Sequence, residues 1–321
     1  MDEVFVRREV IDPATLRSLC VASNGKGALQ TMSHLAAIAA SGTLLGLAGG
    51  TGWAVAIFAV HGTLLNFLYA GQHELSHWTV FRTGWLNEWV GRIFGFVLFY
   101  PRTFDQVQHM AHHRFTQDWS RDGELARARY TRTSYLLWLS GVTYWYTRWR
   151  RILRFSAGII TEPYLPAKRH PELMREARLH VAGYALIVGA SLMAGSWAAV
   201  IFWLAPMLAM KWVHQLQNTM EHLGLPHDDN VLVNTRSTRT NAVMRWLGWQ
   251  MQYHTAHHAF PGVPFHRLRE LNQAIFTARG AAPPSMTYLG FQIAVLRAFR
   301  HGKTEADYPD SGAWITDAPH G

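Results

Sequence analysis

The residues best suited to chemistry in this sequence are its histidines, of which there are 18. The first pair, His73 and His77, lies in the stretch Q-H-E-L-S-H at the end of a long apolar run. Four residues of a helix turn through about 400°, so both imidazoles lie on one face about one turn apart. This geometry suits one metal ion, or two ions held side by side.

Two H-x-x-H-H segments and one N-x-x-x-H segment follow this pair. In an H-x-x-H-H helix the first, fourth and fifth residues share a face, so the three imidazoles converge. The candidate metal-binding histidines of these segments are His109, His112, His113, His222, His254, His257 and His258, and Asn218 begins the N-x-x-x-H segment. With the first pair this gives nine histidines, more than one ion uses. Imidazole suits zinc, copper, iron and nickel, but a zinc site usually takes about four ligands. Two iron ions with four or five nitrogen ligands each use the set best.

A metal-bound imidazole usually donates its other ring N–H to a carboxylate or carbonyl group. We therefore expect some of the acidic residues near these segments to orient the histidines. The candidates are Glu74, Asp105, Asp118, Asp122, Glu221 and Asp228. The histidines interpreted as ordinary core or surface residues are His34, His61, His170, His180, His227, His266, His301 and His320, with His214 ambiguous.

The composition limits what can surround such a site. The chain has 321 residues, of which 49% are hydrophobic, and one cysteine, Cys20. A single cysteine excludes an intramolecular disulfide and any metal cluster held by several thiolates. The mean hydropathy of −0.04 is too low for a chain lying wholly in lipid. It fits a few membrane spans that carry a large polar part.

Four apolar stretches predict two transmembrane hairpins. Residues 33–50 and 53–70 contain no charged residue, and a glycine-rich turn separates them. Each stretch is about 18 residues long, roughly 27 Å as a helix, close to the thickness of the hydrocarbon layer. Residues 180–195 and 197–213 predict the second hairpin. The alternative is a pair of buried hairpins in a soluble protein.

The charges predict how these hairpins are oriented. The net charge is +9, and all 30 Lys and Arg residues lie outside the two hairpin turns, near residues 49–52 and 194–197. The positive-inside rule then places both termini and the polar part in the cytoplasm. The amino terminus shows no signal-peptide pattern. We expect a multi-pass integral membrane protein, in a bacterial inner membrane, rather than a nucleic-acid-binding protein.

The polar regions are expected to form one domain with the spans, over residues 1–321. Residues 1–30 are a polar lead with one short helix after Pro13, and residues 302–321 are a disordered polar tail. Residues 89–100 are apolar but too short to span, and residues 148–154 predict an interfacial helix with aromatic anchors. Residues 286–299 have an amphipathic pattern.

The three histidine segments H-E-L-S-H, H-M-A-H-H and H-T-A-H-H, in this order around two hydrophobic hairpins, resemble the membrane fatty acid desaturase/hydroxylase superfamily. The flanking sequences H-H-R-F-T-Q-D-W-S-R-D-G-E-L and Y-H-T-A-H-H-A-F-P-G-V-P-F are similar to bacterial fatty acid desaturases. The resemblance covers roughly residues 30–275. It implies an all-α membrane protein with four transmembrane helices and a cytoplasmic helical cap that holds a non-haem di-iron site.

The resemblance also implies a division of the ligands. One iron would take His73, His109, His113 and His257, with Asn218 bound through water. The other would take His77, His112, His222, His254 and His258. The first segment departs from the structurally understood acyl-CoA desaturases, because it has three intervening residues where those enzymes have four.

The implied reaction is the O2-dependent oxidation of an unactivated C–H bond in a lipid acyl chain. A methylene group has no acidic proton, so the metal cofactor must supply the oxidant. The flanking residues favour desaturation, while hydroxylation or ketolation of a lipid, carotenoid or alkane is the alternative. We expect no fused b-type cytochrome domain. We therefore expect a separate electron donor, a ferredoxin, a rubredoxin or a b-type cytochrome with its reductase.

Two other classes of protein share part of the pattern. H-E-L-S-H fits the zinc protease motif H-E-x-x-H, in which Glu74 would be the general base. Such a protease would leave both H-x-x-H-H segments unused. A metal transporter would be expected to carry ionisable ligands within its spans, whereas these histidines lie at or beyond the span ends.

Overall fold

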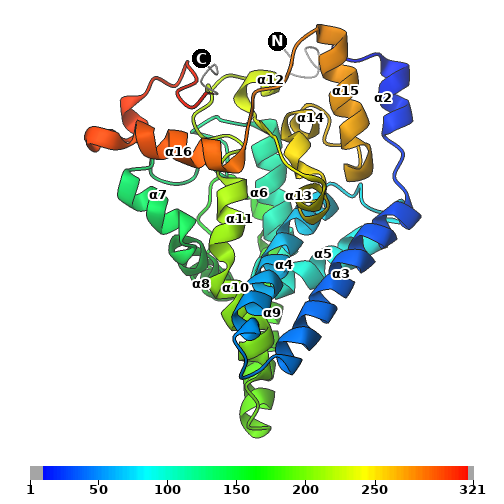
Figure 1. Cartoon of the computed structure of the whole chain (residues 1–321), viewed down its shortest axis with the longest axis vertical. Helices are drawn as coiled ribbons and strands as arrows, with labels where there is room; N and C mark the ends of the chain where they lie inside the picture. Colours follow the sequence, from blue (N-terminus) through cyan, green and yellow to red (C-terminus); the bar gives the residue numbers. More distant parts are fainter. Residues whose placement is uncertain (1–9, 317–321) are drawn as a thin grey trace.

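The computed structural model describes residues 10–316, and helices dominate this part of the chain. The helices α3, α4, α9 and α10 converge toward one narrow end (Figure 1). The helices α2, α12, α14, α15 and α16 lie at the opposite, wide end, with α6 and α11 between the two (Figure 1). The strands of the described part are β1 (Ser237–Thr238) and β2 (Ser285–Met286), which form a short parallel pair.

The first predicted hairpin is present as α3 (Asn24–Leu47) and α4 (Trp53–Ser76). The turn between them contains Gly50, whose φ of 80° is a conformation that glycine adopts without strain. Helix α3 begins nine residues before the predicted span of residues 33–50, at Asn24, where the Ser23 side chain accepts a hydrogen bond from the Lys26 backbone N–H. The short helix expected after Pro13 is confirmed as α2 (Pro13–Leu19).

The second hairpin consists of α9 (His170–Met193) and a broken helix. After the turn, the chain forms the π-helix η2 (Val200–Leu204), then α10 (Ala205–Ala209) and α11 (Lys211–Asn218). The fourth predicted span, residues 197–213, is therefore not one continuous helix. Pro206 has no backbone N–H to offer the Phe202 carbonyl group, which instead lies 2.8 Å from Nε2 of His61 on α4.

Of the helices in residues 10–316, one has the length and composition of a membrane span. This helix is α4, and half of its most apolar window is buried inside the protein. The buried half is the one that leads to His73 and the site below.

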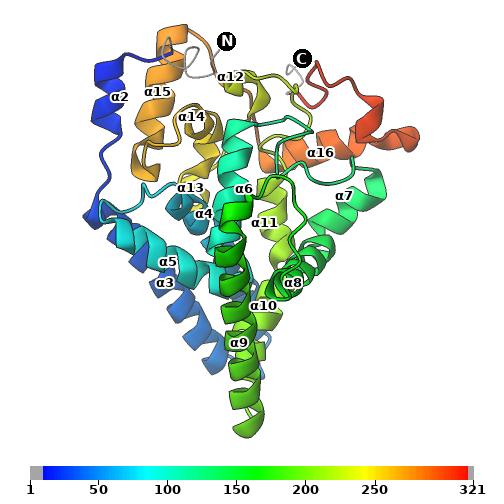
Figure 2. The same cartoon turned by 180° about the vertical axis from the view of Figure 1, so that it is seen from behind.

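The middle of the chain forms the helices α5 to α8; in Figure 2, α6 lies between α5 on the left and α7 and α8 on the right. They are α5 (Gly84–Val97), α6 (Arg102–Arg114), α7 (Arg132–Leu139) and α8 (Val142–Ser156). The short apolar stretch predicted at residues 89–100 lies mostly in α5. One face of α5 exposes Trp85, Trp89 and Ile93, each about 60% accessible. The run at residues 148–154 is helical as predicted and lies in α8.

The C-terminal third consists of short helices joined by turns. They are α12 (Val231–Asn234), α13 (Ala242–Leu247), α14 (His254–Ala259), α15 (Leu268–Arg279) and α16 (Tyr288–Ala298), with the 3₁₀ turns η3 (Met251–Tyr253), η4 (Phe265–Arg267), η5 (Arg300–Gly302) and η6 (Glu305–Asp307). A further turn, η1 (Ala167–Arg169), precedes α9. The amphipathic stretch predicted at residues 286–299 is present as α16, which buries Phe291 and Val295.

The tail that we expected to be disordered is ordered as far as residue 316. Ile315 is 1% exposed and packs at Gly224. Glu305 accepts two hydrogen bonds from Arg127 and one from the Tyr130 backbone N–H. The prediction was wrong for residues 302–316 because long-range ion pairs and a buried isoleucine hold a segment whose local composition is polar. Residues 1–9 and 317–321, including His320, lie outside the described part.

Candidate metal centre

The first histidine pair lies where α4 ends. Its buried second half carries His73 in the last turn, and His77 caps the helix. The ring centroids of His73 and His77 are 5.6 Å apart. The spacing of four residues therefore brings both rings to one side of the helix, as the sequence predicted.

The second segment lies in α6, whose start is fixed by a buried acid. The backbone N–H groups of Arg102 and Thr103 donate to the Glu176 carboxylate at 3.1 and 2.8 Å. Nε2 of His109 lies 2.7 Å from Nε2 of His77 on α4. Nε2 of His113 lies 2.9 Å from the same His109 atom. The first and fifth residues of this H-x-x-H-H segment thus face α4.

The third segment is α14, in which every residue is buried. Nε2 of His257 lies 2.9 Å from Nε2 of His73 and 3.2 Å from Nε2 of His113. The Thr255 hydroxyl accepts a hydrogen bond from Ser237 at 3.1 Å, which anchors the turn from the side away from the other histidines. This short helix therefore closes the cluster formed by α4 and α6.

The histidine atoms fall into two groups in which all ligand atoms lie within 4.8 Å of one another. One group contains His73, His77, His109, His113 and His257, and the other contains His112, His222 and His258. His254 adjoins the second group, because its Nε2 lies 2.9 Å from Nε2 of His222. The structure therefore brings all nine predicted histidines together. Asn218, at the end of α11, lines the same cavity as His112 and His222.

The grouping differs from the resemblance-based division at one residue, His77, which lies with the first group. The reason is the length of the first segment. Three intervening residues place the second ring about 40° around the helix from the first, so both rings reach one centre. Four intervening residues would turn the second ring by about 140°, toward a different centre.

Carboxylates lie on the outer, Nδ1 side of four of these rings. Nδ1 of His112 lies 2.9 Å from Asp122, and Nδ1 of His257 lies 3.3 Å from Glu74. Nδ1 of His109 lies 3.6 Å from Glu124, and Nδ1 of His254 lies 3.7 Å from Glu221. The Asp122 contact is a hydrogen bond, which holds the ring proton of His112 on Nδ1 and leaves its Nε2 lone pair free for a metal. The other three contacts are not hydrogen bonds.

The sequence-based list of these acids was partly wrong. Asp105 accepts from the Ser76 hydroxyl, Asp118 pairs with Arg121, and Asp228 accepts from the Asn230 backbone N–H. None of the three lies against a histidine of the cluster. Glu124 was not predicted, although it lies in the H-H-R-F-T-Q-D-W-S-R-D-G-E-L stretch, two residues after Asp122. Its position in that stretch was the available signal.

The electrostatics of the cluster fit a metal site. Burial and the neighbouring imidazoles lower the pKa of His109, His113 and His258 well below the usual value for histidine. These rings are therefore neutral at neutral pH, the form in which imidazole binds metals. Several neutral rings that direct Nε2 atoms at one another within 3.2 Å bring lone pairs together, an arrangement that a cation stabilises.

His112 differs from the other rings. Burial alone would lower its pKa, but the nearby Asp122 and Glu124 carboxylates outweigh burial and raise the pKa to about 9. Its Nε2 lies 3.1 Å from Nε2 of His222. This ring thus belongs to a second centre with a more negative surrounding than the first.

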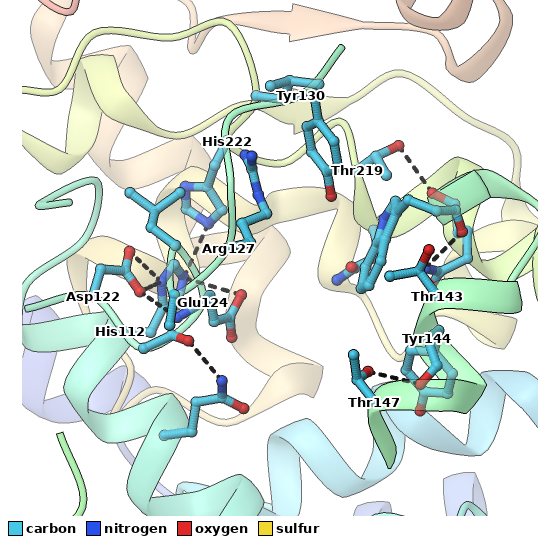
Figure 3. A pocket seen from close by; sticks show the side chains of 18 of the residues that line it. His112, Asp122, Glu124, Arg127, Tyr130, Thr143, Tyr144, Thr147, Thr219 and His222 are labelled. Atoms are coloured by element: carbon cyan, nitrogen blue, oxygen red, sulfur yellow. Dashed lines mark hydrogen bonds and ion pairs between the residues drawn. The ribbon is translucent and has the colours of Figure 1, made fainter. Parts of the chain in front are cut away.

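A cavity of about 370 Å³ adjoins this second centre. In Figure 3, His112, Asp122, Glu124 and His222 lie on one side of it, and Thr143, Tyr144 and Thr147 of α8 face them from the other side. Leu125, Leu137 and Trp138 contribute apolar surface. The arrangement would place an elongated, partly apolar molecule beside the second group of histidines.

The remaining histidines have the structural roles expected of them where their contacts are known. His34 bridges the Leu64 carbonyl and the Trp249 indole, and His61 bridges Ser41 and Phe202. His214, which the sequence left ambiguous, lies 3.0 Å from Lys211 Nζ and is in neither histidine group.

Comparison with known proteins agrees with this geometry. Residues 33–290 match the family described as "Fatty acid desaturase". A similar curated protein is the sn-1 oleoyl-lipid 12-desaturase of Arthrospira platensis, 21% identical over 240 residues, covering 66% of this chain and 65% of that protein. Another is the sn-1 oleoyl-lipid 12-desaturase of Picosynechococcus sp., 24% identical over 237 residues, covering 68% of each chain. The chain thus matches about two thirds of the length of these relatives.

Proposed function

Because this chain belongs to the fatty acid desaturase family, we propose that it inserts a double bond into a lipid acyl chain in an O2-dependent reaction. The observation that carries the proposal is the convergence of nine histidines from three segments around two adjacent centres. Side-chain acids and bases cannot oxidise a methylene group, so a reaction of this class needs a metal cofactor.

The residues present fit two iron ions. One ion would be held by His73, His77, His109, His113 and His257. The other would be held by His112, His222, His254 and His258, with Asn218 bound through water as the resemblance implies. When bound, the two irons and dioxygen supply an oxidant strong enough to remove hydrogen from an unactivated methylene group.

The protein's own residues prepare this site in three ways. Asp122 holds the proton on Nδ1 of His112 and so orients that imidazole, while Glu74, Glu124 and Glu221 lie close to the outer nitrogens of His257, His109 and His254. Burial of seven of the nine histidines, with His77 and His222 partly exposed, limits the access of bulk water. The cavity beside His112 and His222 holds the acyl chain in a fixed position relative to the second centre.

We also propose that the chain spans the membrane four times, as two hairpins, with both termini and the metal site in the cytoplasm. Both hairpin turns lack Lys and Arg, which supports this orientation. Electrons would come from a separate ferredoxin, rubredoxin or b-type cytochrome with its reductase.

Expression of the full chain in a bacterial host without its own desaturases tests the function. We expect new double bonds in the total fatty acids, located by mass spectrometry of derivatised esters, and about two irons per purified chain. A host expressing the His257→Ala chain serves as control. New hydroxyl groups without double bonds would favour the hydroxylase alternative. One zinc per chain with peptidase activity would contradict an oxidase of either kind.

A further inference from the structure

The cavity beside the second centre has a cationic wall opposite the histidines. This wall is formed by Tyr100 and by Tyr144, Arg148 and Arg151 of α8. Figure 3 shows Tyr144 and Thr147 across the cavity from His112 and His222. The guanidinium carbon of Arg148 lies 3.4 Å from the ring centroid of Tyr100 and 4.6 Å from that of Tyr144. Arg148 is therefore clamped between two aromatic rings at the far wall.

Arg148 forms no ion pair with an acid in the described part of the chain. Within residues 10–316, no carboxylate lies within 4.0 Å of its guanidinium group, and its buried Nε has no hydrogen-bond acceptor. Arginines elsewhere around the cavity are different, because Arg127 is paired in a bidentate manner with Glu305. A buried guanidinium without an anion is unfavourable, since it has lost water without gaining a partner.

A second arginine lies beside it. Nε and Nη1 of Arg151 are buried without a hydrogen bond, and the nearest carboxylate, that of Glu162, is 4.0 Å away and already bonded by Arg154. The nearby Lys211 differs, because its Nζ lies 3.0 Å from Nδ1 of His214. Two guanidinium groups at this wall thus keep buried donors without an acceptor.

We propose that Arg148 and Arg151 bind the anionic head, a carboxylate or a phosphate, of an amphiphile whose acyl chain lies in the cavity beside His112 and His222. Guanidinium groups form charge-assisted, often bidentate hydrogen bonds with both kinds of anion. The inference rests on the proposed function, because it takes the cavity as the substrate site. It narrows the substrate from any lipid to one that carries a negative charge near its polar end.

Binding without turnover tests this assignment. The full-length protein in a neutral detergent is labelled with a fluorophore at Cys20, its one cysteine, which is exposed. Kd values for oleate, oleyl phosphate and oleyl alcohol are then measured by thermophoresis without a reductant. The three probes share one chain, so they differ only in the head. The ratio of variant to wild-type Kd for each probe cancels its partition into micelles.

The informative variants are Arg148→Gln and Arg151→Gln, with Arg150→Gln, an exposed arginine of the same helix, as matched control. We expect the first two to raise the Kd of oleate, of oleyl phosphate or of both by at least about tenfold. The Kd of oleyl alcohol should stay within about twofold. The control should change none of the three. The anion with the larger loss identifies the head as a fatty carboxylate or a phospholipid-type phosphate.

An equal increase for all three probes would assign the arginines to packing and overturn the proposal, as would no increase for any. If Arg148→Gln does not give monodisperse protein, Arg151→Gln decides, because that side chain is 19% exposed and less tightly held. If the expression host gains double bonds but the arginine variants do not distinguish the charged probes from oleyl alcohol, this inference fails and the proposed function stands. If the variants do distinguish them but the host gains no oxidised product, the proposed function fails and this inference stands.

Discussion

At the scale of single residues, the outer nitrogens of four of the nine histidines face acids. Three segments supply these four acids, of which Glu74, Asp122 and Glu221 were predicted from the sequence. Glu74 and Glu221 each adjoin a histidine in the chain, and Asp122 lies nine residues after His113. Glu124 serves His109, fifteen residues earlier, through a loop whose path local spacing does not give.

Loss of one histidine from either group should remove metal and activity together. His112→Ala and His257→Ala change different groups, and each removes one Nε2 atom that lies about 3 Å from a neighbouring ring nitrogen. We expect desaturation to be abolished and bound iron, measured by plasma mass spectrometry, to fall below two per chain. His301→Asn, an exposed histidine with a φ of 58° that asparagine tolerates, is the control. Unchanged turnover in either alanine variant would remove that residue from the site.

Replacement of Glu124 tests whether the acid that sequence reasoning missed is functional. Glu124→Gln keeps the shape but removes the charge that lies 3.6 Å from His109 Nδ1. Activity or iron affinity should fall by about 10- to 100-fold. Asp118→Asn, in the same loop but paired with Arg121, should have little effect on either. If both variants have the same activity and iron affinity, Glu124 has no specific role at the metal centre.

At the scale of the elements, both hairpins could be predicted, because uncharged runs and glycine turns are local signals. The residues at which the helices begin and end could not be predicted in the same way. The start of α3 depends on a cap at Ser23 inside a polar stretch, and the break in the fourth stretch depends on a contact between distant residues. Pro206 has no N–H for the carbonyl group of Phe202. His61, 141 residues before Phe202, lies within hydrogen-bond distance of that carbonyl group instead. A search for uncharged runs detects neither event.

The crossing of α4 and α10 is close enough to be tested by one methyl group. A Cβ on Gly62 would overlap the Pro206 carbonyl oxygen, which is backbone and cannot move aside. Gly62→Ala should lower the free energy of unfolding by about 1–3 kcal/mol, seen as a lower Tm in detergent. Gly52→Ala, where a Cβ meets no atom within 4 Å and φ is −61°, should change it by less than about 0.5 kcal/mol. Equal Tm values would show that the helices separate freely here.

At the scale of the whole molecule, the C-terminal segment holds the loop that carries two of the acids. Arg127 and Arg129 form bidentate pairs with Glu305 and Asp310, and the Trp314 backbone N–H donates to the Gly224 carbonyl. Composition alone predicted disorder here, because most residues of the tail are polar or small. Its order comes from partners about 180 residues away, which composition does not encode.

The Arg127–Glu305 pair acts as a clamp on the loop, and breaking this clamp should weaken the whole cap. Glu305→Gln removes the charge that holds Arg127 at 2.7 and 3.1 Å, in a site where Glu305 is 4% exposed. Since Arg127 is partly exposed, we expect a loss of about 2 kcal/mol in unfolding free energy, measured as a lower Tm, with lower activity. Glu270→Gln, in an exposed pair with Arg267, should cost less than about 0.5 kcal/mol. Similar losses in both would make the clamp an ordinary surface pair.

The same clamp has a consequence for biosynthesis. Arg127 emerges from the ribosome 178 residues before its partner Glu305. A nascent chain therefore contains all nine histidines well before the loop bearing Asp122 and Glu124 acquires its final anchor. A chain released just before Glu305 would carry every metal-binding residue of this site and still lack the contact that holds the loop in place. Completion of synthesis is thus the step that fixes the surroundings of the second centre.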